Sequence, residues 1–137
     1  MIGSTDQEVV KEAIPILTKY LGDSDSLLKI DTVDLIVVSG LQVKPEVWIR
    51  DAALMALGDI GEKNPELVKE SIPMIVSCLR RPESYTRRKA IIALGQIGKN
   101  TRSLIEPYIK HLKRVVEEDS DDKVRLEAKR VYESLNS

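Results

Sequence analysis

The chain of 137 residues contains no phenylalanine, and aromatic residues make up only 4% of it. Its core must therefore be built from Val, Ile, Leu and Ala side chains. The chain also has a single cysteine, Cys78, and a single histidine, His111. One cysteine excludes an intrachain disulfide bond. One cysteine with one histidine excludes a zinc site of the usual four-ligand kind.

Neither of these two residues has the surroundings of a catalytic group. Cys78 lies in the apolar run Met74–Leu79, a setting typical of a buried, unreactive thiol. His111 lies among basic neighbours, as a solvated helix residue does. No glycine-rich loop of the kind that binds phosphate is found. The sequence therefore predicts no catalytic residue, no metal and no cofactor.

The chain also lacks an excess of charge of either sign. Lys and Arg number 21 and Asp and Glu number 22, which gives a net charge of −1. This balance provides no general attraction to nucleic acid or to an anionic membrane. The N-terminal residues lack the features of a signal peptide, and no apolar run approaches the roughly 20 residues that span a bilayer. We therefore expect a soluble, cytoplasmic protein without membrane contact.

What the sequence does contain is an internal repeat. Residues 34–61 align without a gap on residues 71–98, an offset of 37 residues, and nine of the 28 positions are identical. A second overlay, at an offset of 58 residues, places Val10–Pro15 on Val68–Pro73. Within these units, apolar residues recur at intervals of three and four, which is the periodicity of an amphipathic helix. The repeat unit is therefore helical.

The pattern predicts seven helices, no strand and no linker, so that residues 1–137 form a single domain. The expected helices are Thr5–Leu21, Ser26–Ser39, Pro45–Ile60, Pro65–Leu79, Glu83–Ile97, Thr101–Glu118 and Asp121–Leu135. We interpret Gly61 and Gly98 as glycine stops at helix ends. Asn64 and Pro65 are interpreted as an N-cap residue and the first residue of a helix.

Two segments resemble the second helix of a HEAT repeat. They are Arg50-x-x-Ala53-x-x-Ala56-Leu57-Gly58-x-Ile60-Gly61 and Arg87-x-x-Ala90-x-x-Ala93-Leu94-Gly95-x-Ile97-Gly98. The resemblance implies an all-α solenoid of about three and a half helix pairs in a right-handed superhelix. Pro15, Pro73 and Pro107 match the bend that the family has in its first helices.

The position of the helix expected at Ser26–Ser39 stays open between the two overlays. The offset of 58 makes it a second helix, whereas the offset of 37 makes it a first helix. Seven helices cannot all pair, so we interpret the N-terminal helix as a half repeat that caps the stack.

The resemblance also implies a ladder in which an aspartate in the turn pairs with the basic residue six positions later. The pairs that fit this spacing are Asp23 with Lys29 and Asp119 with Arg125. In the two middle repeats, Lys44 and Arg81 stand where the aspartate belongs. Arg50 and Arg87 therefore either lack this partner or take one from a neighbouring repeat.

Two charged segments have both a structural and a functional interpretation. The acidic segment Glu117–Asp122 lacks the ligand spacing and central glycine of a calcium loop, so we interpret it as a turn that favours a helix N-terminus. The basic segment Arg80–Lys89 holds five cations. It is either a solvated corner or a site for an anion or an acidic partner.

Two aromatic residues mark a candidate binding surface. Trp48 and Tyr85 occupy equivalent repeat positions, two residues before Arg50 and Arg87. Such residues dominate the binding energy of protein interfaces, although both rings could equally pack over the turn. Arg88 stands where the preceding repeat has an aspartate, so the repeat does not require its charge.

The resemblance favours a non-enzymatic scaffold or adaptor for protein–protein interaction. We expect a partner protein that is acidic or polar at the contact, bound through Trp48, Tyr85, Arg87 and Arg88. The first alternative is a nucleic-acid or phosphate-binding module that uses Arg80–Lys89. The second is an accessory subunit of an enzyme such as a bilin lyase, a name attached to similar repeats, although no residue here supports it.

Overall fold

The computed structural model describes residues 11–19, 21 and 45–136, and every element in this part of the chain is helical. Residues 11–19 and 21 form the first helix. The elements that follow are α3 (Pro45–Lys63), η2 (Pro65–Ser71), α4 (Ile72–Ser77), η3 (Cys78–Arg80), α5 (Ser84–Gly98), α6 (Arg102–Ile105), η4 (Glu106–Tyr108), α7 (Ile109–Glu118) and α8 (Asp122–Asn136), where η marks a 3₁₀ helix. The all-α prediction is confirmed.

Prolines account for the 3₁₀ segments that precede α4 and α7. Pro73 is the second residue of α4, just after η2 ends, and Pro107 is the middle residue of η4. Proline lacks the N–H that the α-helical ladder needs, so the backbone takes up the tighter 3₁₀ pattern around it. The count of seven helices was therefore wrong in detail, because the expected helices Pro65–Leu79 and Thr101–Glu118 are each divided into three. The expected helix Ser26–Ser39 lies outside the described residues.

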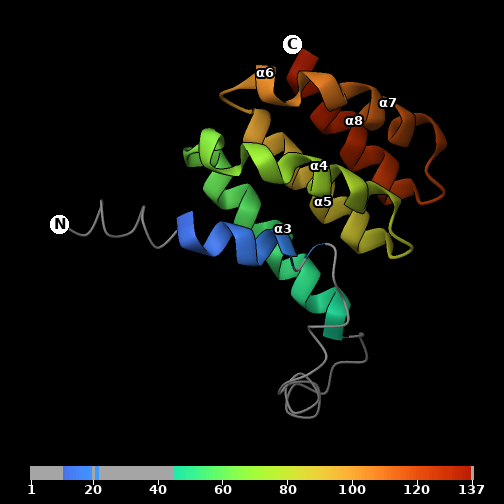
Figure 1. The fold of residues 1–137 in the computed structure, drawn as a ribbon. Helices are drawn as coiled ribbons and strands as arrows, with labels where there is room; N and C mark the ends of the chain where they lie inside the picture. Colours follow the sequence, from blue (N-terminus) through green and yellow to red (C-terminus); the bar gives the residue numbers. More distant parts are fainter. Residues whose placement is uncertain (1–10, 20, 22–44, 137) are drawn as a thin grey trace.

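The helices form two layers (Figure 1). In one layer α3 packs against α5, and α5 packs against α8. The other layer holds the first helices, which are residues 11–21, the segment from η2 to η3, and the segment from α6 to α7. Neighbouring pairs thus share one continuous aliphatic core, which is the arrangement of a solenoid. The right-handed twist of the superhelix stays a prediction.

The first helix packs as a member of a pair rather than as a lone cap. Its residue Leu21 is fully buried, and the carbonyl oxygen of Leu21 accepts a hydrogen bond from Nε of Arg50 in α3 at 3.2 Å. Thr18 Oγ1 lies 2.6 Å from Ser71 Oγ in η2. Through these contacts, residues 11–19 and 21 lie beside α3 in the way that the segment from η2 to η3 lies beside α5. The overlay at 58 residues predicts this equivalence. These contacts differ from our interpretation of this helix as an unpaired half repeat.

Of the glycines that we interpreted as helix stops, Gly98 is the last residue of α5, whereas α3 continues past Gly61 to Lys63. Lys99 after Gly98 keeps right-handed helical angles. A methyl group on Gly98 would lie 2.7 Å from Cδ2 of Leu135. One on Gly61 would meet side chains of α5 and η2 at similarly short range. These glycines therefore allow close approach of neighbouring helices. Asn64 does precede η2, but its side chain makes no capping hydrogen bond.

The core is aliphatic, as the composition predicts, and it includes Cys78. The Cys78 side chain is fully buried. Burial raises the pKa of its thiol, outweighing the opposing effect of the nearby Arg81 and Arg50. The interpretation of Cys78 as buried is therefore confirmed, and the raised pKa favours the protonated thiol at neutral pH.

Candidate functional site

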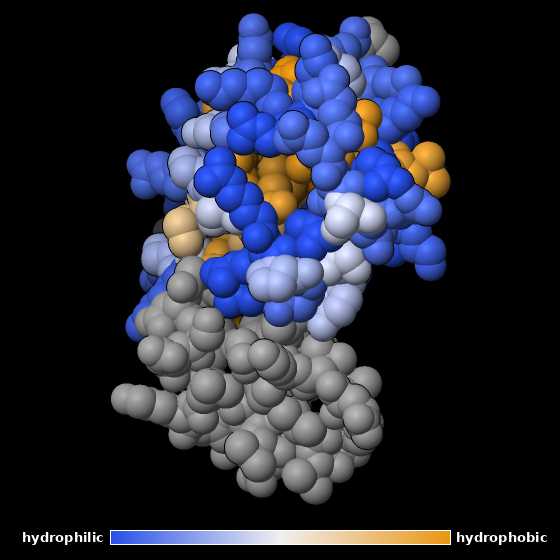
Figure 2. All heavy atoms as spheres, turned by 90° about the vertical axis from the view of Figure 1, so that its right-hand side faces the viewer, coloured by the Kyte–Doolittle hydropathy of each residue, from blue (hydrophilic) through white to orange (hydrophobic). Residues whose placement is uncertain are grey.

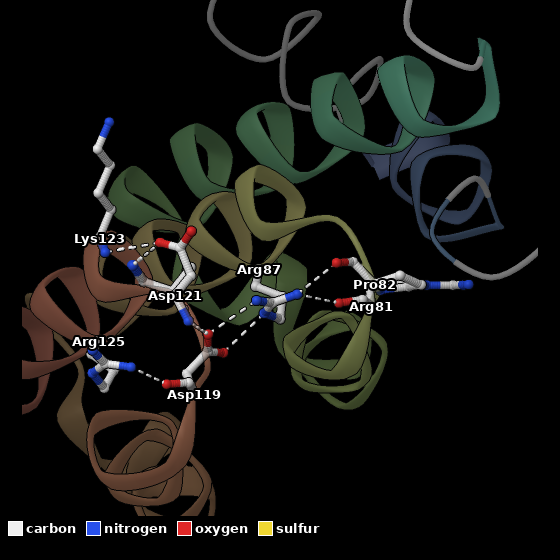
Figure 3. Close-up of polar contacts among 8 residues, drawn as sticks. Arg81, Pro82, Arg87, Asp119, Asp121, Lys123 and Arg125 are labelled. Atoms are coloured by element: carbon white, nitrogen blue, oxygen red, sulfur yellow. Dashed lines mark hydrogen bonds and ion pairs between the residues drawn. The ribbon is translucent and has the colours of Figure 1, made fainter.

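Arg87, near the start of α5, joins two neighbouring helix pairs (Figure 3). Its Nε and Nη2 donate to the two carboxylate oxygens of Asp119 at 2.9 and 3.0 Å. Its Nη1 donates to the carbonyl oxygens of Arg81 and Pro82, both at 2.8 Å. The side chains of Arg87 and Asp119 are only 11% and 7% exposed. Arg87 therefore takes its aspartate from the neighbouring repeat, which was one of the two expected arrangements.

The surroundings of Asp119 favour its ionised form. Burial, the largest single effect, would raise the pKa of its carboxyl group, but the hydrogen bonds from Arg87 and from the backbone N–H of Asp121 and the charges of Arg87 and Arg125 together outweigh it. The pKa of Asp119 consequently lies below its ordinary value. The carboxylate is charged at neutral pH and holds two helix pairs together.

A common arrangement links the arginines at the equivalent repeat position. Each donates to a carbonyl oxygen at the end of the first helix of its own pair: Arg50 to Leu21, Arg87 to Arg81, and Arg125 to Asp119. Such terminal carbonyls have no partner within their own helix. The expected contact of Asp119 with Arg125 runs through the Asp119 carbonyl oxygen, whereas the Asp119 carboxylate binds Arg87 and Arg125 also pairs with Asp122. Asp23, the other expected member of the ladder, lies outside the described residues.

The basic segment Arg80–Lys89 does not form one surface. Arg81 donates to the carbonyl oxygen of Leu21 at 3.1 Å, and Arg87 is held by Asp119. Arg88 points to Glu127 of α8, while Arg80 lines a hollow between η3 and α7. The cations that are adjacent in sequence therefore serve different contacts in the fold.

Tyr85 and Arg88 line a hollow of about 520 Å³ near the N-terminal ends of α5 and α8. Tyr85 is 41% exposed, and the Arg88 side chain is 42% exposed. Nη2 of Arg88 lies 4.0 Å from Oε1 of Glu127, whereas its Nε is buried and has no hydrogen-bond partner among the described residues. The opposite wall of the hollow is the turn Ser120–Lys123. Trp48 lies in α3, but its side chain is outside the described part.

Beneath this hollow, a buried hydrogen bond joins α3 to α5. Oγ1 of Thr86 donates to Oδ1 of Asp51 at 2.7 Å, and both residues are buried. Burial raises the pKa of Asp51, against the hydrogen bond from Thr86 and the charges of Lys89 and Arg50. Sequence reasoning used Asp51 only as the counterpart of Arg88 and missed this contact. The available signal was Thr86 itself, a polar residue at the repeat position where the preceding unit has the aliphatic Ile49.

A family model for HEAT repeats matches residues 36–133, more than half of the chain. The chain belongs to the HEAT-repeat family. No curated protein and no solved structure gave a significant match. The segments that resemble the second helix of a HEAT repeat correspond to α3 and α5, and α8 continues the same layer. At the turns between the first and second HEAT helices, Arg87 and Arg125 donate hydrogen bonds to main-chain oxygens, and Arg87 also binds the carboxylate of Asp119.

Two features are absent from the part of the HEAT stack that the structure describes. No group of three or more His, Cys, Asp or Glu side chains in those residues could hold a metal ion. No helix among them is long and apolar enough to cross a membrane. His111 lies in the hollow between η3 and α7, where burial and the charges of Lys110, Arg114 and Arg80 lower its pKa. The imidazole is therefore neutral at pH 7.

Proposed function

We propose that this HEAT-repeat chain is a non-enzymatic protein-interaction module that binds an acidic or polar segment of another protein across Tyr85 and Arg88. The observation that carries the proposal is the state of Arg88. Its guanidinium borders an open hollow, its side chain is 42% exposed, and its ion pair with Glu127 is long, at 4.0 Å. A carboxylate or a main-chain carbonyl of a partner would accept hydrogen bonds from the guanidinium.

The surroundings of Arg88 suit a binding surface. Tyr85 supplies an exposed ring on the same hollow, and its phenol stays protonated because burial and the charges of Asp51 and Glu83 raise its pKa. A tyrosine beside an arginine is a frequent source of interface binding energy. Arg87 lies beneath this surface with its donors already engaged by Asp119, Arg81 and Pro82. We therefore assign Arg87 a supporting role and propose Trp48 as a further contact.

The nucleic-acid alternative draws no support from the fold. Arg81 and Arg87 donate to main-chain oxygens or to Asp119, so neither is available to a row of phosphates. The neutral net charge adds no general attraction. The protein-binding proposal therefore stands alone.

Replacing Arg88 with glutamine should weaken binding of the partner by about 1–3 kcal/mol, as loss of an interface arginine does. The free energy of unfolding should change by less than about 1 kcal/mol, because the contact with Glu127 is long, at 4.0 Å. Glutamine is preferred to glutamate because a carboxylate would face Glu127. The partner is captured from native cell extract, and both affinities are measured by calorimetry.

The matched control is Lys113→Gln, which removes an exposed charge from α7 that lines none of the hollows described. Its affinity should equal that of the unmodified chain. An Arg88→Gln protein that folds normally and binds as tightly as the control would show that Arg88 is only a solvated corner residue.

A further inference from the structure

A second hollow lies between successive first helices, on the other side of the turn that carries Asp119. It is about 160 Å³ in volume and is lined by residues of α4, η3 and α7. Its apolar lining is formed by Val76, Leu79 and Val115. Figure 2 faces the side of the molecule where these helices end, and it shows an apolar patch within a hydrophilic surface. The space suits one aliphatic side chain.

The rim of this hollow carries the cations Arg80 and Arg114 and the carboxylates Glu118 and Asp119. Arg80, His111 and Arg114 contribute to it from two successive first helices, and Lys110 is close enough to affect His111. Arg80 is exposed and makes no hydrogen bond or ion pair within the described part of the chain. Of the two carboxylates at the rim, one binds an arginine outside the hollow and the other lies at the long-distance limit of an ion pair. Asp119 is held by Arg87, and Glu118 is 70% exposed and 3.9 Å from Arg114.

His111 lies within reach of the same cations. Burial lowers its pKa first, and the charges of Lys110, Arg114 and Arg80 lower it further. Cations that disfavour protonation of an imidazole favour a bound carboxylate at the same place.

The repeat does not account for these cations. The offset of 58 residues places Arg80 on Gly22, so the preceding unit has no equivalent of Arg80. The hollow at the preceding junction, beside residues 11–19, is also lined by both acidic and basic side chains. Arg80 is therefore a cation that belongs to this junction rather than to the repeat.

We propose that this hollow is a second docking site, which takes a linear acidic segment of a partner protein by inserting one aliphatic side chain between Val76, Leu79 and Val115. Carboxylates on either side of that side chain contact Arg80 and Arg114. The charge of the rim selects an acidic segment over a basic one, and the apolar floor selects an aliphatic residue over a purely charged sequence.

The probe is the peptide acetyl-Glu-Glu-Leu-Glu-Glu-amide, titrated into the full chain and followed by amide chemical shifts in NMR spectra. Two comparison peptides replace the leucine with alanine or all glutamates with lysine. We expect saturable shifts at the residues that line the hollow. The alanine peptide should bind about tenfold more weakly, since most of a buried aliphatic side chain is lost. The lysine peptide should not bind.

The double variant Arg80→Gln with Arg114→Gln should weaken the leucine peptide roughly three- to tenfold, because each exposed charge pair contributes little by itself. Both side chains are exposed, and a thermal melt confirms the fold. Lys113→Gln, which lines neither hollow, should leave peptide affinity unchanged, and Arg88→Gln should alter shifts only at the Tyr85–Arg88 hollow. Equal binding of the leucine and alanine peptides, shifts spread over remote cations such as Lys129, an equal loss in Lys113→Gln, or no saturable binding would each overturn the proposal.

Discussion

Replacing Asp119 with alanine is expected to lower the free energy of unfolding by about 3–4 kcal/mol, the usual cost of removing one partner of a buried ion pair. The variant leaves Nε and Nη2 of Arg87 without their acceptors in a place where the arginine side chain is 11% exposed. It also removes the acceptor of the Asp121 N–H, which now donates to Oδ1 of Asp119 at 2.9 Å. Urea unfolding followed by circular dichroism measures the change.

The same pair sets the acid dependence of stability. Because the pKa of Asp119 is depressed in the folded state, its contribution is complete above the ordinary value of 3.8 and is lost as the pH falls through the lower folded-state pKa. The unmodified chain should therefore lose stability over that acid range. Asp119→Ala should lose less over the same range.

Two controls separate this pair from general effects of charge. Asp122→Ala removes a 91% exposed carboxylate from the same turn and should cost less than about 1 kcal/mol. Asp51→Asn keeps an acceptor for Thr86 and should change stability at pH 7 by no more than about 1 kcal/mol.

The stability that Asp51 contributes in the unmodified chain depends on pH in the opposite sense to that of Asp119. The raised pKa of Asp51 gives a contribution that is complete below 3.8 and is lost as the pH rises through the folded-state pKa. Equal losses in Asp119→Ala and Asp122→Ala would contradict the role given to Arg87.

Replacing Gly61 with alanine is expected to destabilise the protein by about 1–3 kcal/mol, the usual cost of overpacking a core. A methyl group there would lie 2.8 Å from Cγ2 of Val68 and closer still to Cγ1 of Ile97. Both neighbours are fully buried and cannot move aside. The sign of the change in stability is informative, because replacing glycine with alanine in an exposed helix stabilises a protein by roughly 0.5–1 kcal/mol. Thermal and urea unfolding measure it.

Gly95→Ala is the matched control for that substitution. A methyl group at Gly95 would lie 3.1 Å from Cγ2 of Val131, so that a shift of a few tenths of an ångström accommodates it. Its effect should be smaller than that of Gly61→Ala. An increase in stability on replacing Gly61 would show that the helices are not packed as closely as the structure has them.

Much of the architecture could be predicted because a repeat imposes the same local pattern several times. The overlays placed the second helices Glu83–Ile97 and Asp121–Leu135 within a residue of α5 and α8. Prolines marked the breaks in the first helices, since a missing N–H acts locally. The roles of Gly61 and Gly98 could not be inferred from their own helices. Their surroundings come from Val68, Ile97 and Leu135 in other elements.

The candidate site was harder to predict because side-chain partners depend on the packing of neighbouring repeats. Spacing along the chain assigned Asp119 to Arg125, but the stack brings Arg87 of the preceding pair closer to its carboxylate. Because the cations of Arg80–Lys89 are close in sequence, one basic surface was a candidate there. In the structure these residues are divided between the end of η3, the turn after it and α5, and their side chains have different partners. Arg88 was singled out from the sequence because the repeat does not require its charge. Its unpartnered Nε could be found only in the structure.

The most direct test of the proposed function is site-specific photocrosslinking in the native cell. A photoreactive phenylalanine analogue replaces Tyr85 in one version of the chain and Lys113 in another, and crosslinked products are identified by mass spectrometry. We predict that position 85 captures a discrete partner protein, that position 113 does not, and that adding Arg88→Gln removes the crosslink at 85. Equal capture at both positions, or a crosslink at 85 that persists in Arg88→Gln, would contradict a binding surface at Tyr85 and Arg88.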